Sequence, residues 1–323
     1  MKKTLLMLLA ASVVGIGVTP LVAQAADKKK PVRATLHSKQ DQQVRAKKSV
    51  KAMNPTGRAR SISTDVTDGQ QGLALQSSAV LVQDQITGAV LYEKNANAVL
   101  PIASITKLMT AMVALDAQPD LQETLTISVE DVDTLKGTHS RLGVGTRLSR
   151  EEMLRLALMS SENRAASALS RYYPGGQKAF LAAMNAKAAE LELADTQFFD
   201  PTGLTPANVS SPRDLARMVD AAHRYPLIRE FTTTVGEEVN VAGRSQQFSN
   251  TNALVHNSTW NIGLSKTGYI NEAGRCLVMQ AWIGSKPVII VLLDSVGKMT
   301  RVVDANRIKR WVETTAWPRL PTS

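Results

Sequence analysis

The sequence contains few cysteine, histidine and aromatic residues. Cys276 is the only cysteine among 323 residues, so the chain can form neither an intramolecular disulfide nor a zinc site built from several cysteines. The four histidines are widely separated without metal-ligand spacing, and aromatic residues make up 4% of the chain. The sequence therefore predicts no metal and no cofactor, and it offers no aromatic platform on which sugars or bases could stack.

Basic residues outnumber acidic ones, but the excess is local. The chain has 38 Lys and Arg against 28 Asp and Glu, a net charge of +10. Residues 1–25 carry a net charge of +2. Residues 26–72 hold eleven basic and four acidic residues, a net charge of +7, and residues 73–323 hold 25 basic and 24 acidic residues, a net charge of +1. A nucleic-acid-binding domain concentrates positive charge on a folded face. Because the large third segment is nearly neutral, we expect no nucleic-acid partner.

The first 25 residues have the pattern of an export signal. Two lysines follow Met1, an apolar run extends over 5–18, Pro20 interrupts it, and 23–25 read Ala-Gln-Ala. This order is typical of a secretory signal peptide, with cleavage predicted after Ala25. An uncleaved membrane anchor is the alternative, but the run is shorter than the roughly 20 residues that a spanning helix needs.

Residues 26–72 are rich in Lys, Gln, Ser, Thr and Gly and show no sustained apolar periodicity. This composition predicts a basic, disordered tether. Two interpretations remain open for it. The tether contacts anionic envelope surfaces electrostatically, or it is a solubilising linker.

Residues 73–323 are predicted to form an α+β domain. Apolar strands open and close the segment, and helical spacing fills its middle, so distant ends of the chain should pair in one antiparallel sheet. The predicted strands are 79–84, 89–93, 262–269, 274–283 and 288–294, and the predicted helices are 105–115, 151–159, 164–172, 179–193, 214–223 and 301–314.

Ser104 and Lys107 form the first chemical motif, at the start of an apolar helix after Pro101. Residues three apart share one face of a helix, so the amine can take the hydroxyl proton. Backbone N–H groups at the helix start can stabilise an oxyanion. The same S-x-x-K spacing recurs at Ser295 and Lys298. We interpret that second copy as a turn between a strand and a helix, because it follows an apolar strand and contains a glycine.

Two further motifs follow. Ser161-Glu162-Asn163 lies between two predicted helices, where a hydroxyl and an amide can point into a cleft, or where Ser161 caps the next helix. Lys266-Thr267-Gly268 lies on a predicted strand, where Lys and Thr can hold a carboxylate and Gly allows close approach of a ligand backbone. The alternative for Lys266 is an exposed lysine on an edge strand with a bulge.

The three motifs together, S-x-x-K, S-x-N and K-T-G in this order, are the set of penicillin-binding proteins and class A β-lactamases. Over about residues 75–315 the chain resembles low-molecular-mass penicillin-binding proteins of the D-alanyl-D-alanine peptidase family, and among these the endopeptidases most. Segments 101–111, 159–166 and 199–204 also look like family segments. The resemblance implies the β-lactamase/transpeptidase-like fold, with a five-stranded antiparallel sheet flanked by helices and a helical lobe.

The resemblance also implies a role for each motif. Ser104 attacks a D-Ala carbonyl to form an acyl-enzyme, and Lys107 is its base, with a pKa lowered by burial and by nearby Lys266. Ser161 protonates the leaving amine while Asn163 orients the substrate and Lys107. Lys266 and Thr267, with Gly268, hold the substrate carboxylate, and the N–H groups of Ser104 and Tyr269 bind the oxyanion. Glu162 receives no role.

The predicted reaction is hydrolysis of D-alanyl-diaminopimelate cross-links in peptidoglycan, with β-lactams as covalent inhibitors. No E-x-x-L-N segment lies between Ser161 and Lys266, which argues against efficient penicillin hydrolysis. The 55 residues after Gly268 are too few for the extra domain usual in the family's carboxypeptidases. The alternatives are a carboxypeptidase, a transpeptidase and a non-catalytic wall-binding or β-lactam-sensing protein. The family resemblance places the exported protein in the periplasm.

Overall fold

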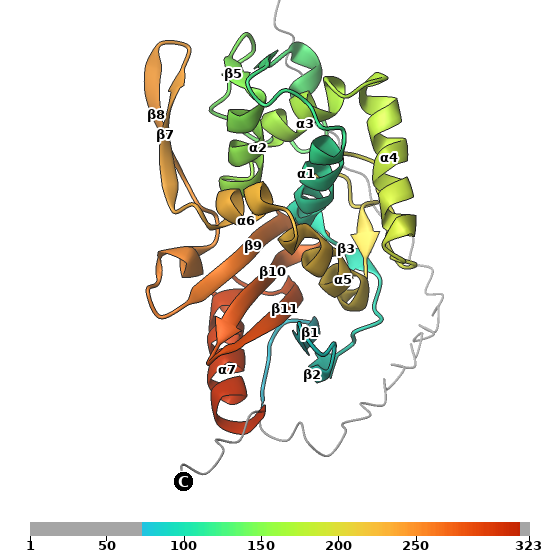
Figure 1. The fold of residues 1–323 in the computed structure, drawn as a ribbon, viewed down its shortest axis with the longest axis vertical. Coiled ribbons are helices and arrows are strands. Elements are labelled where there is room, and N and C mark those ends of the chain that lie inside the picture. Colours follow the sequence, from blue (N-terminus) through green and yellow to red (C-terminus); the bar gives the residue numbers. More distant parts are fainter. Residues whose placement is uncertain (1–72, 317–323) are drawn as a thin grey trace, which may run out of the picture. The chain divides into compact units, whose positions relative to one another are not determined.

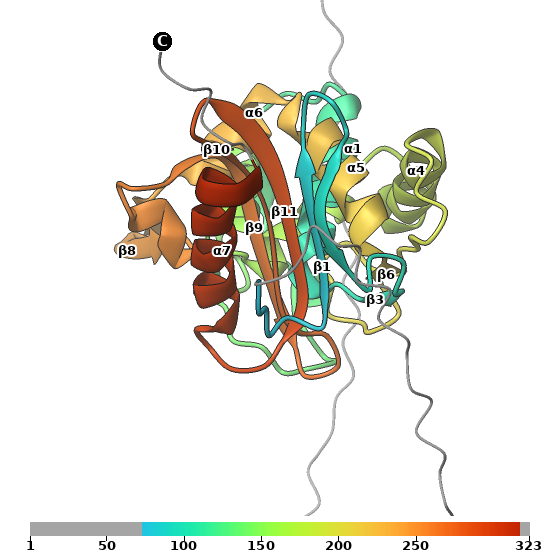
Figure 2. The same cartoon turned by 90° about the horizontal axis from the view of Figure 1, so that it is seen from below.

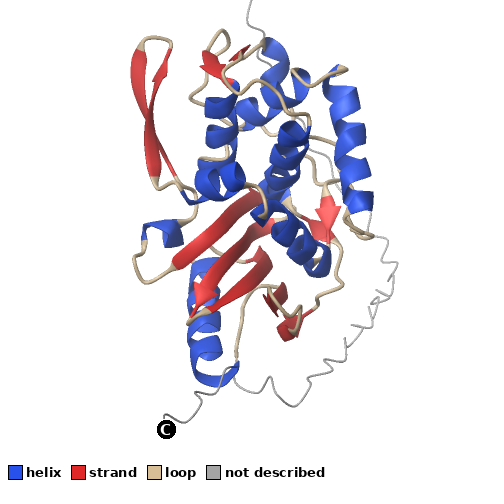
Figure 3. Ribbon diagram, viewed as in Figure 1, coloured by secondary structure: helices blue, strands red, loops and turns tan. Residues whose placement is uncertain are grey.

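A five-stranded antiparallel sheet with helices on both faces organises the chain in the computed structural model, which describes residues 73–316 (Figures 1 and 3). The strand order is β2-β1-β11-β10-β9. The predicted α+β architecture is therefore confirmed. The strands are β1 (Ala79–Asp84), β2 (Val90–Lys94), β9 (Asn261–Ile270), β10 (Gly274–Ile283) and β11 (Lys286–Ser295).

Strands from the two ends of the described chain meet in the middle of this sheet. β1 pairs with β11 in an antiparallel register that sets Ala79 opposite Leu293. β10 then pairs with β11 on one side and β9 on the other. The closure predicted from the separated apolar strands is confirmed, and it makes β9 an edge strand of the sheet.

The alternation of side chains along the strands creates two cores. Leu81 and Val291 belong to the larger core under the helical part of the protein. Their neighbours Val80 and Leu292 point to the opposite face, where they pack with Ile308 of helix α7 (Thr300–Trp311). Figure 2 shows α7 lying across that face. The predicted closing helix is confirmed, although its last residues, Val312–Ala316, form a π-helical turn.

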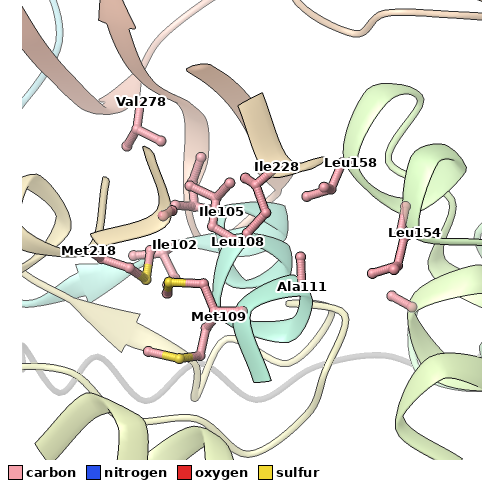
Figure 4. Packing of buried hydrophobic residues seen from close by; sticks show 14 of the residues in the cluster. Ile102, Ile105, Leu108, Met109, Ala111, Leu154, Leu158, Met218, Ile228 and Val278 are labelled. Carbon is pink, nitrogen blue, oxygen red and sulfur yellow. The ribbon is translucent and has the colours of Figure 1, made fainter. Parts of the chain in front are cut away.

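Helix α1 (Thr106–Asp116) is enclosed by other elements. Its residues from 106 to 114 are all buried, which explains why its apolar residues cover more than one face. Figure 4 shows side chains of α1 packing with Leu154 and Leu158, with Met218 and Ile228, and with Val278 of the sheet. This position makes the start of α1 a rigid platform.

The other helices around α1 agree with the predicted ones to within a few residues. Side-chain caps mark two of the starts: Ser149 accepts a hydrogen bond from the Glu152 N–H, and Ser211 accepts one from the Asp214 N–H, next to Pro212. The helices are α2 (Arg150–Met159), α3 (Asn163–Arg171), α4 (Gly176–Glu190) and α5 (Pro212–His223).

Several elements were not predicted. Helix α6 (Pro226–Thr233) lies beside β9, and a hairpin of β7 (Gly236–Val241) and β8 (Arg244–Ser249) extends from the same region (Figure 1). The hairpin is largely polar, so it lacks the apolar run that identified the other strands. Short strand pairs complete the fold: β3 (Leu100–Pro101) with β6 (Val209–Ser210), and β4 (Thr124–Thr126) with β5 (Arg147–Ser149). The 3-10 turns are η1 (Ala103–Ile105), η2 (Val129–Asp131) and η3 (Ala253–His256).

The predicted signal peptide and basic tether lie outside the described residues. Within residues 73–316, no helix combines the length and apolar character needed to cross a bilayer.

Candidate active site

Ser104 lies on the 3-10 turn η1, immediately before α1. The preceding residue, Ala103, has a φ of 46°, a left-handed conformation that is unfavourable for a residue with a Cβ. Such strain persists only where the surroundings enforce it, and it is common at functional sites. The turn therefore presents Ser104 in a conformation that the local sequence alone does not favour.

Two glycines pack against this turn from opposite parts of the chain. A Cβ at Gly203 would lie 1.9 Å from the Ala103 carbonyl oxygen, and a Cβ at Gly268 would lie 2.8 Å from the Ile102 carbonyl oxygen. Neither position has room for a side chain. Gly268 was expected to allow close approach of a ligand backbone, and the structure adds a second reason for glycine there: the Ser104 turn packs directly against β9.

Lys107 is completely buried beneath Ser104. Its Nζ donates hydrogen bonds to Ser104 Oγ at 2.8 Å, to Asn163 Oδ1 at 2.7 Å and to the Thr202 carbonyl at 2.7 Å. Three partners use all three hydrogens of an ammonium group. The S-x-x-K motif and the asparagine of S-x-N therefore converge on one amine.

Burial lowers the pKa of Lys107 to about 7, while the carboxylates of Asp200 and Glu162 oppose that shift. An amine with this pKa is substantially neutral near pH 7 and can accept a proton. The expected lowering by burial is confirmed. The expected repulsion between the two lysines appears on the other partner, because the charge of Lys107 lowers the pKa of Lys266.

Ser161 and Asn163 face the same cleft. Ser161 has a φ of 63°, and its Oγ accepts a hydrogen bond of 2.9 Å from Lys266 Nζ. The interpretation of Ser161 as a helix cap is wrong, since Glu162 occupies the N-cap position of α3 without any side-chain cap bond. The strained backbone instead turns the hydroxyl toward β9.

Lys266 and Thr267 are buried on β9 although it is an edge strand. Lys266 is 1% exposed, so its alternative interpretation as an exposed edge lysine is wrong. Burial, followed by the charges of Lys107 and Arg301, holds the pKa of Lys266 well below its usual range. Thr267 Oγ1 donates a hydrogen bond of 2.7 Å to Thr251 Oγ1. An amine and a hydroxyl thus lie next to Ser161.

Tyr269 follows these residues on β9, and its side chain is half exposed. The Arg275 guanidinium lies 4.4 Å from the centre of its ring. Behind the strand, Arg301 Nη1 donates hydrogen bonds of 3.4 Å to the carbonyls of Gly268 and Cys276. Arg301 adds a positive charge to the site that sequence reasoning missed.

Sequence reasoning also missed residues that hold the motifs in place. Asp200 Oδ1 and Oδ2 accept hydrogen bonds from the N–H groups of Thr202, Gly203 and Thr205, which fixes the loop that touches Lys107 and the Ser104 turn. Glu162 is buried and accepts a hydrogen bond of 2.6 Å from Ser140 Oγ. The family-like segment 199–204 was the available signal for Asp200.

The second S-x-x-K copy is structural, as predicted. Ser295 ends β11, is buried, and lies 2.7 Å from Ser77 Oγ, and α7 begins five residues later. Cys276 likewise packs in β10 as expected, and burial raises the pKa of its thiol to about 11.

Two cavities meet at Asn163. One, of about 340 Å³, is lined by residues 139–141 and 160–163 and thus adjoins the Ser161 hydroxyl. The other, of about 380 Å³, is lined by residues of the 130–135 and 199–205 segments. The cleft can therefore accept extended groups on both sides of Asn163.

The family model for peptidase S11, described as D-alanyl-D-alanine carboxypeptidase, matches residues 64–297. The chain belongs to this family. All eight residues predicted for the site, from Ser104 to Tyr269, fall inside the matched region of this S11 peptidase.

Relatives of this S11 peptidase carry a more specific description. The D-alanyl-D-alanine endopeptidase of Pseudomonas aeruginosa is 50% identical over 258 residues, which cover 79% of this chain and 82% of the relative. The endopeptidase of Escherichia coli K12 is 46% identical over 242 residues, which cover 74% and 78%. The crystal structure of the Streptomyces K15 DD-transpeptidase superposes with a TM-score of 0.69 at 29% identity, covering 74% of this chain and 97% of that one. The resemblance inferred from the motifs is confirmed.

Proposed function

We propose that this S11 peptidase is a serine DD-endopeptidase that hydrolyses D-alanyl-diaminopimelate cross-links of peptidoglycan. The observation that carries the proposal is the buried amine of Lys107, 2.8 Å from Ser104 Oγ, with a pKa of about 7. Two relatives described as endopeptidases, at 50% and 46% identity, support the choice of endopeptidase.

Acylation begins at Ser104. Neutral Lys107 takes the hydroxyl proton as Ser104 Oγ bonds to the D-Ala carbonyl carbon. The carbonyl oxygen gains the negative charge, and we assign its stabilisation to the main-chain N–H groups of Ser104 and Tyr269. The tetrahedral intermediate then expels the amine of the second peptide.

The leaving amine needs a proton, and Ser161 is placed to give it. Lys266 Nζ donates to Ser161 Oγ at 2.9 Å, so Lys266, in its protonated form, can replace the proton that Ser161 passes on. Lys266 and Thr267 also hold the free carboxylate of the diaminopimelate D-centre. Asn163 orients the substrate amide together with Lys107. Water finally attacks the acyl-enzyme: a water proton returns to Lys266 through Ser161, and protonated Lys107 gives its proton back to Ser104 Oγ as the peptide acid leaves.

The space beside Ser161 suits a large leaving group. The cavity of about 340 Å³ lined by residues 139–141 and 160–163 adjoins this hydroxyl. A carboxypeptidase releases a single D-alanine there, whereas an endopeptidase releases a diaminopimelate residue that is still attached to its own peptide. A cavity at this place leaves room for the larger leaving group of the second reaction.

We also propose that the protein acts in the periplasm after cleavage following Ala25, and that β-lactams acylate Ser104. The signal-like pattern of residues 1–25 supports export. The basic segment 26–72 would contact anionic envelope surfaces. Salt-independent envelope association, or equal association of a chain starting at residue 73, would contradict that contact.

The test is a digest of purified cross-linked muropeptides followed by mass spectrometry. Wild type should convert dimers to monomers, Ser104→Ala should not, and Ser295→Ala should match wild type because it alters only the second S-x-x-K copy. Intact dimers after incubation with wild type, or cleavage by Ser104→Ala, would overturn the proposal.

Two further measurements separate the alternatives. Release of D-alanine from pentapeptide monomers at a rate exceeding dimer cleavage would indicate a carboxypeptidase. Labelling with a fluorescent penicillin reports acylation alone. Failure of wild type to form a covalent adduct would indicate a non-catalytic binding protein.

A further inference from the structure

Residues 133–142, here called the cleft loop, make several contacts with the elements around the site, three of which define its course. Lys136 Nζ lies 2.5 Å from Glu272 Oε1 in the turn after β9. Arg141 Nη1 donates a hydrogen bond of 2.7 Å to the Gln247 carbonyl on β8. Between them, Thr138 Oγ1 accepts a hydrogen bond of 3.1 Å from Asn163 Nδ2. The contact of Thr138 is with Asn163, which itself accepts a hydrogen bond from Lys107, the base.

The side chain of Asn163 has two ends of similar shape but opposite hydrogen-bonding character. Its Oδ1 accepts from Lys107 Nζ, and the Thr202 carbonyl does the same. A neutral amine has two N–H donors and one lone pair. With both donors directed to these two carbonyls, the lone pair is left facing Ser104.

A reversed amide would undo this arrangement. Its N–H group would point at Lys107 and compete with the Ser104 hydroxyl for the lone pair. The direction of the Asn163 amide therefore decides whether the base is available to the nucleophile.

Thr138 can only accept from Asn163, because its single hydroxyl hydrogen is already committed. Thr138 Oγ1 donates to Asp133 Oδ2 at 2.7 Å. Asp133 in turn accepts from the main-chain N–H groups of Leu135, Lys136 and Thr138 at 2.8 to 2.9 Å. A carboxylate surrounded by donors acts purely as an acceptor, so the direction of every bond from Asp133 to Lys107 is fixed.

We propose that Thr138, held by Asp133, is a positioning residue that fixes the amide of Asn163 so that the lone pair of Lys107 faces Ser104. This inference rests on the proposed roles of Ser104 and Lys107. It gives the cleft loop a role in acylation, although Thr138 and Asp133 belong to none of the three motifs.

The expected signature follows from the charges around Lys107. Asp200 and Glu162 face the amine, and Lys266 lies across the cleft beside Ser161. None of these changes when Thr138 loses its hydroxyl. An amide free to reverse brings its N–H dipole toward Lys107, which disfavours the protonated amine. In a variant without the Thr138 hydroxyl, the maximal acylation rate at high pH should therefore fall. The rise of the rate with pH should also occur at lower pH than in wild type.

The test compares Thr138→Val with wild type in rapid acylation by a fluorescent penicillin from pH 5.5 to 9. Loss of one orienting hydrogen bond should lower the plateau about tenfold. Thr138→Ser, which keeps the hydroxyl, should recover to within about twofold of wild type. Thr124→Val is the matched control, because Thr124 is an exposed threonine on β4 that lines neither cavity.

A double-mutant cycle shows whether Thr138 acts through Asn163. In an Asn163→Ala background, Thr138→Val should add less than a twofold loss. A full tenfold loss in that background, an unchanged plateau in Thr138→Val, or an acidic limb moved to higher pH would each overturn the inference. Thr138→Ala supplies a second hydroxyl deletion should valine disturb the fold, which circular dichroism and thermal unfolding report. Absence of acylation in wild type would instead refute the proposed function itself.

Discussion

Lys107 Nζ and Ser104 Oγ lie 2.8 Å apart across one helical turn, with the amine sealed from solvent. Burial costs the charged form its hydration, so the pKa of this lysine falls to about 7 from its usual value of 10.5. The base beside the nucleophile therefore changes between its protonated and neutral forms near neutral pH.

The first prediction is the pH dependence of acylation. Only the neutral amine accepts the Ser104 proton, so the acylation rate should rise with pH through about 7 and stop rising above pH 8. Stopped-flow measurement with a fluorescent penicillin checks this. A rate that still climbs between pH 8 and 9.5 would mean that Lys107 keeps its ordinary pKa.

The second prediction concerns the charge of Glu162. Its carboxylate favours protonated Lys107, so Glu162→Gln should lower the pKa of Lys107 and move the acidic limb of the acylation profile to lower pH. The fraction of maximal rate retained at pH 6 should rise. Glu190→Gln, an exposed carboxamide control on α4, should leave the profile unchanged. A limb that moves to higher pH in Glu162→Gln would contradict the prediction.

The third prediction separates steric contact from backbone strain at two glycines. Gly203 and Gly243 both have a φ of 81°, but a Cβ at 203 would meet the Ala103 carbonyl, whereas a Cβ at 243 would meet nothing within 4 Å. Gly243→Ala should cost about 1 kcal/mol of unfolding free energy and leave acylation intact. Gly203→Ala should cost about 3 kcal/mol and lose most acylation, because the Ser104 turn must shift.

Denaturant unfolding and penicillin labelling of the two glycine variants provide the comparison. Equal destabilisation by both substitutions would show that φ alone matters at position 203. Full labelling of Gly203→Ala would show that the turn can move without disturbing Ser104.

The fourth prediction concerns a buried carboxylate remote from the motifs. Asp304 Oδ2 on α7 accepts hydrogen bonds from the N–H groups of Gln76 and Ser77 and from Ser77 Oγ, at 2.8 to 3.0 Å. Asp304→Ala leaves these donors unpaired and should lower the free energy of unfolding by about 2–4 kcal/mol. The exposed-site control Asp120→Ala should change it by less than about 1 kcal/mol.

Acylation distinguishes a local from a general effect of Asp304→Ala. Protein that remains folded should label with penicillin at the wild-type rate, since α7 packs Asp304 against the segment before β1. A slowed rate in fully folded protein would contradict this separation of stability from chemistry.

The sheet could be predicted because its strands are apolar on both faces. Strands such as 274–283 are covered on both sides, so they appear as continuous hydrophobic runs. The β7–β8 hairpin could not be predicted, because its stability depends on Val239, Val241 and Phe248 meeting residues from distant elements. Local pattern carries no information about such tertiary contacts.

The motif residues could be predicted because each combines residue types with a recognisable chemistry. The supporting residues form no such motif, although the family-like segment 199–204 includes Asp200. Thr138 and Asp200 are single polar residues in irregular segments, and their importance arises only when the chain brings them to Asn163 and to the loop beneath Ser104. Likewise, the carboxylates of Asp200 and Glu162 act on the pKa of Lys107 only because the fold brings them close to its amine.

The antiparallel pairing of β1 with β11 also determines the order in which the parts of the active site come together during synthesis and folding. The serine and its lysine are synthesised early, whereas Lys266, Thr267 and the glycine that supports the Ser104 turn arrive with β9, and the sheet closes only when β11 pairs with β1. Pairings so distant in sequence form late in folding. A growing or truncated chain that lacks β9 to β11 therefore carries Ser104 and Lys107 without Lys266 and Thr267, and we expect peptidase activity only after β11 has paired with β1.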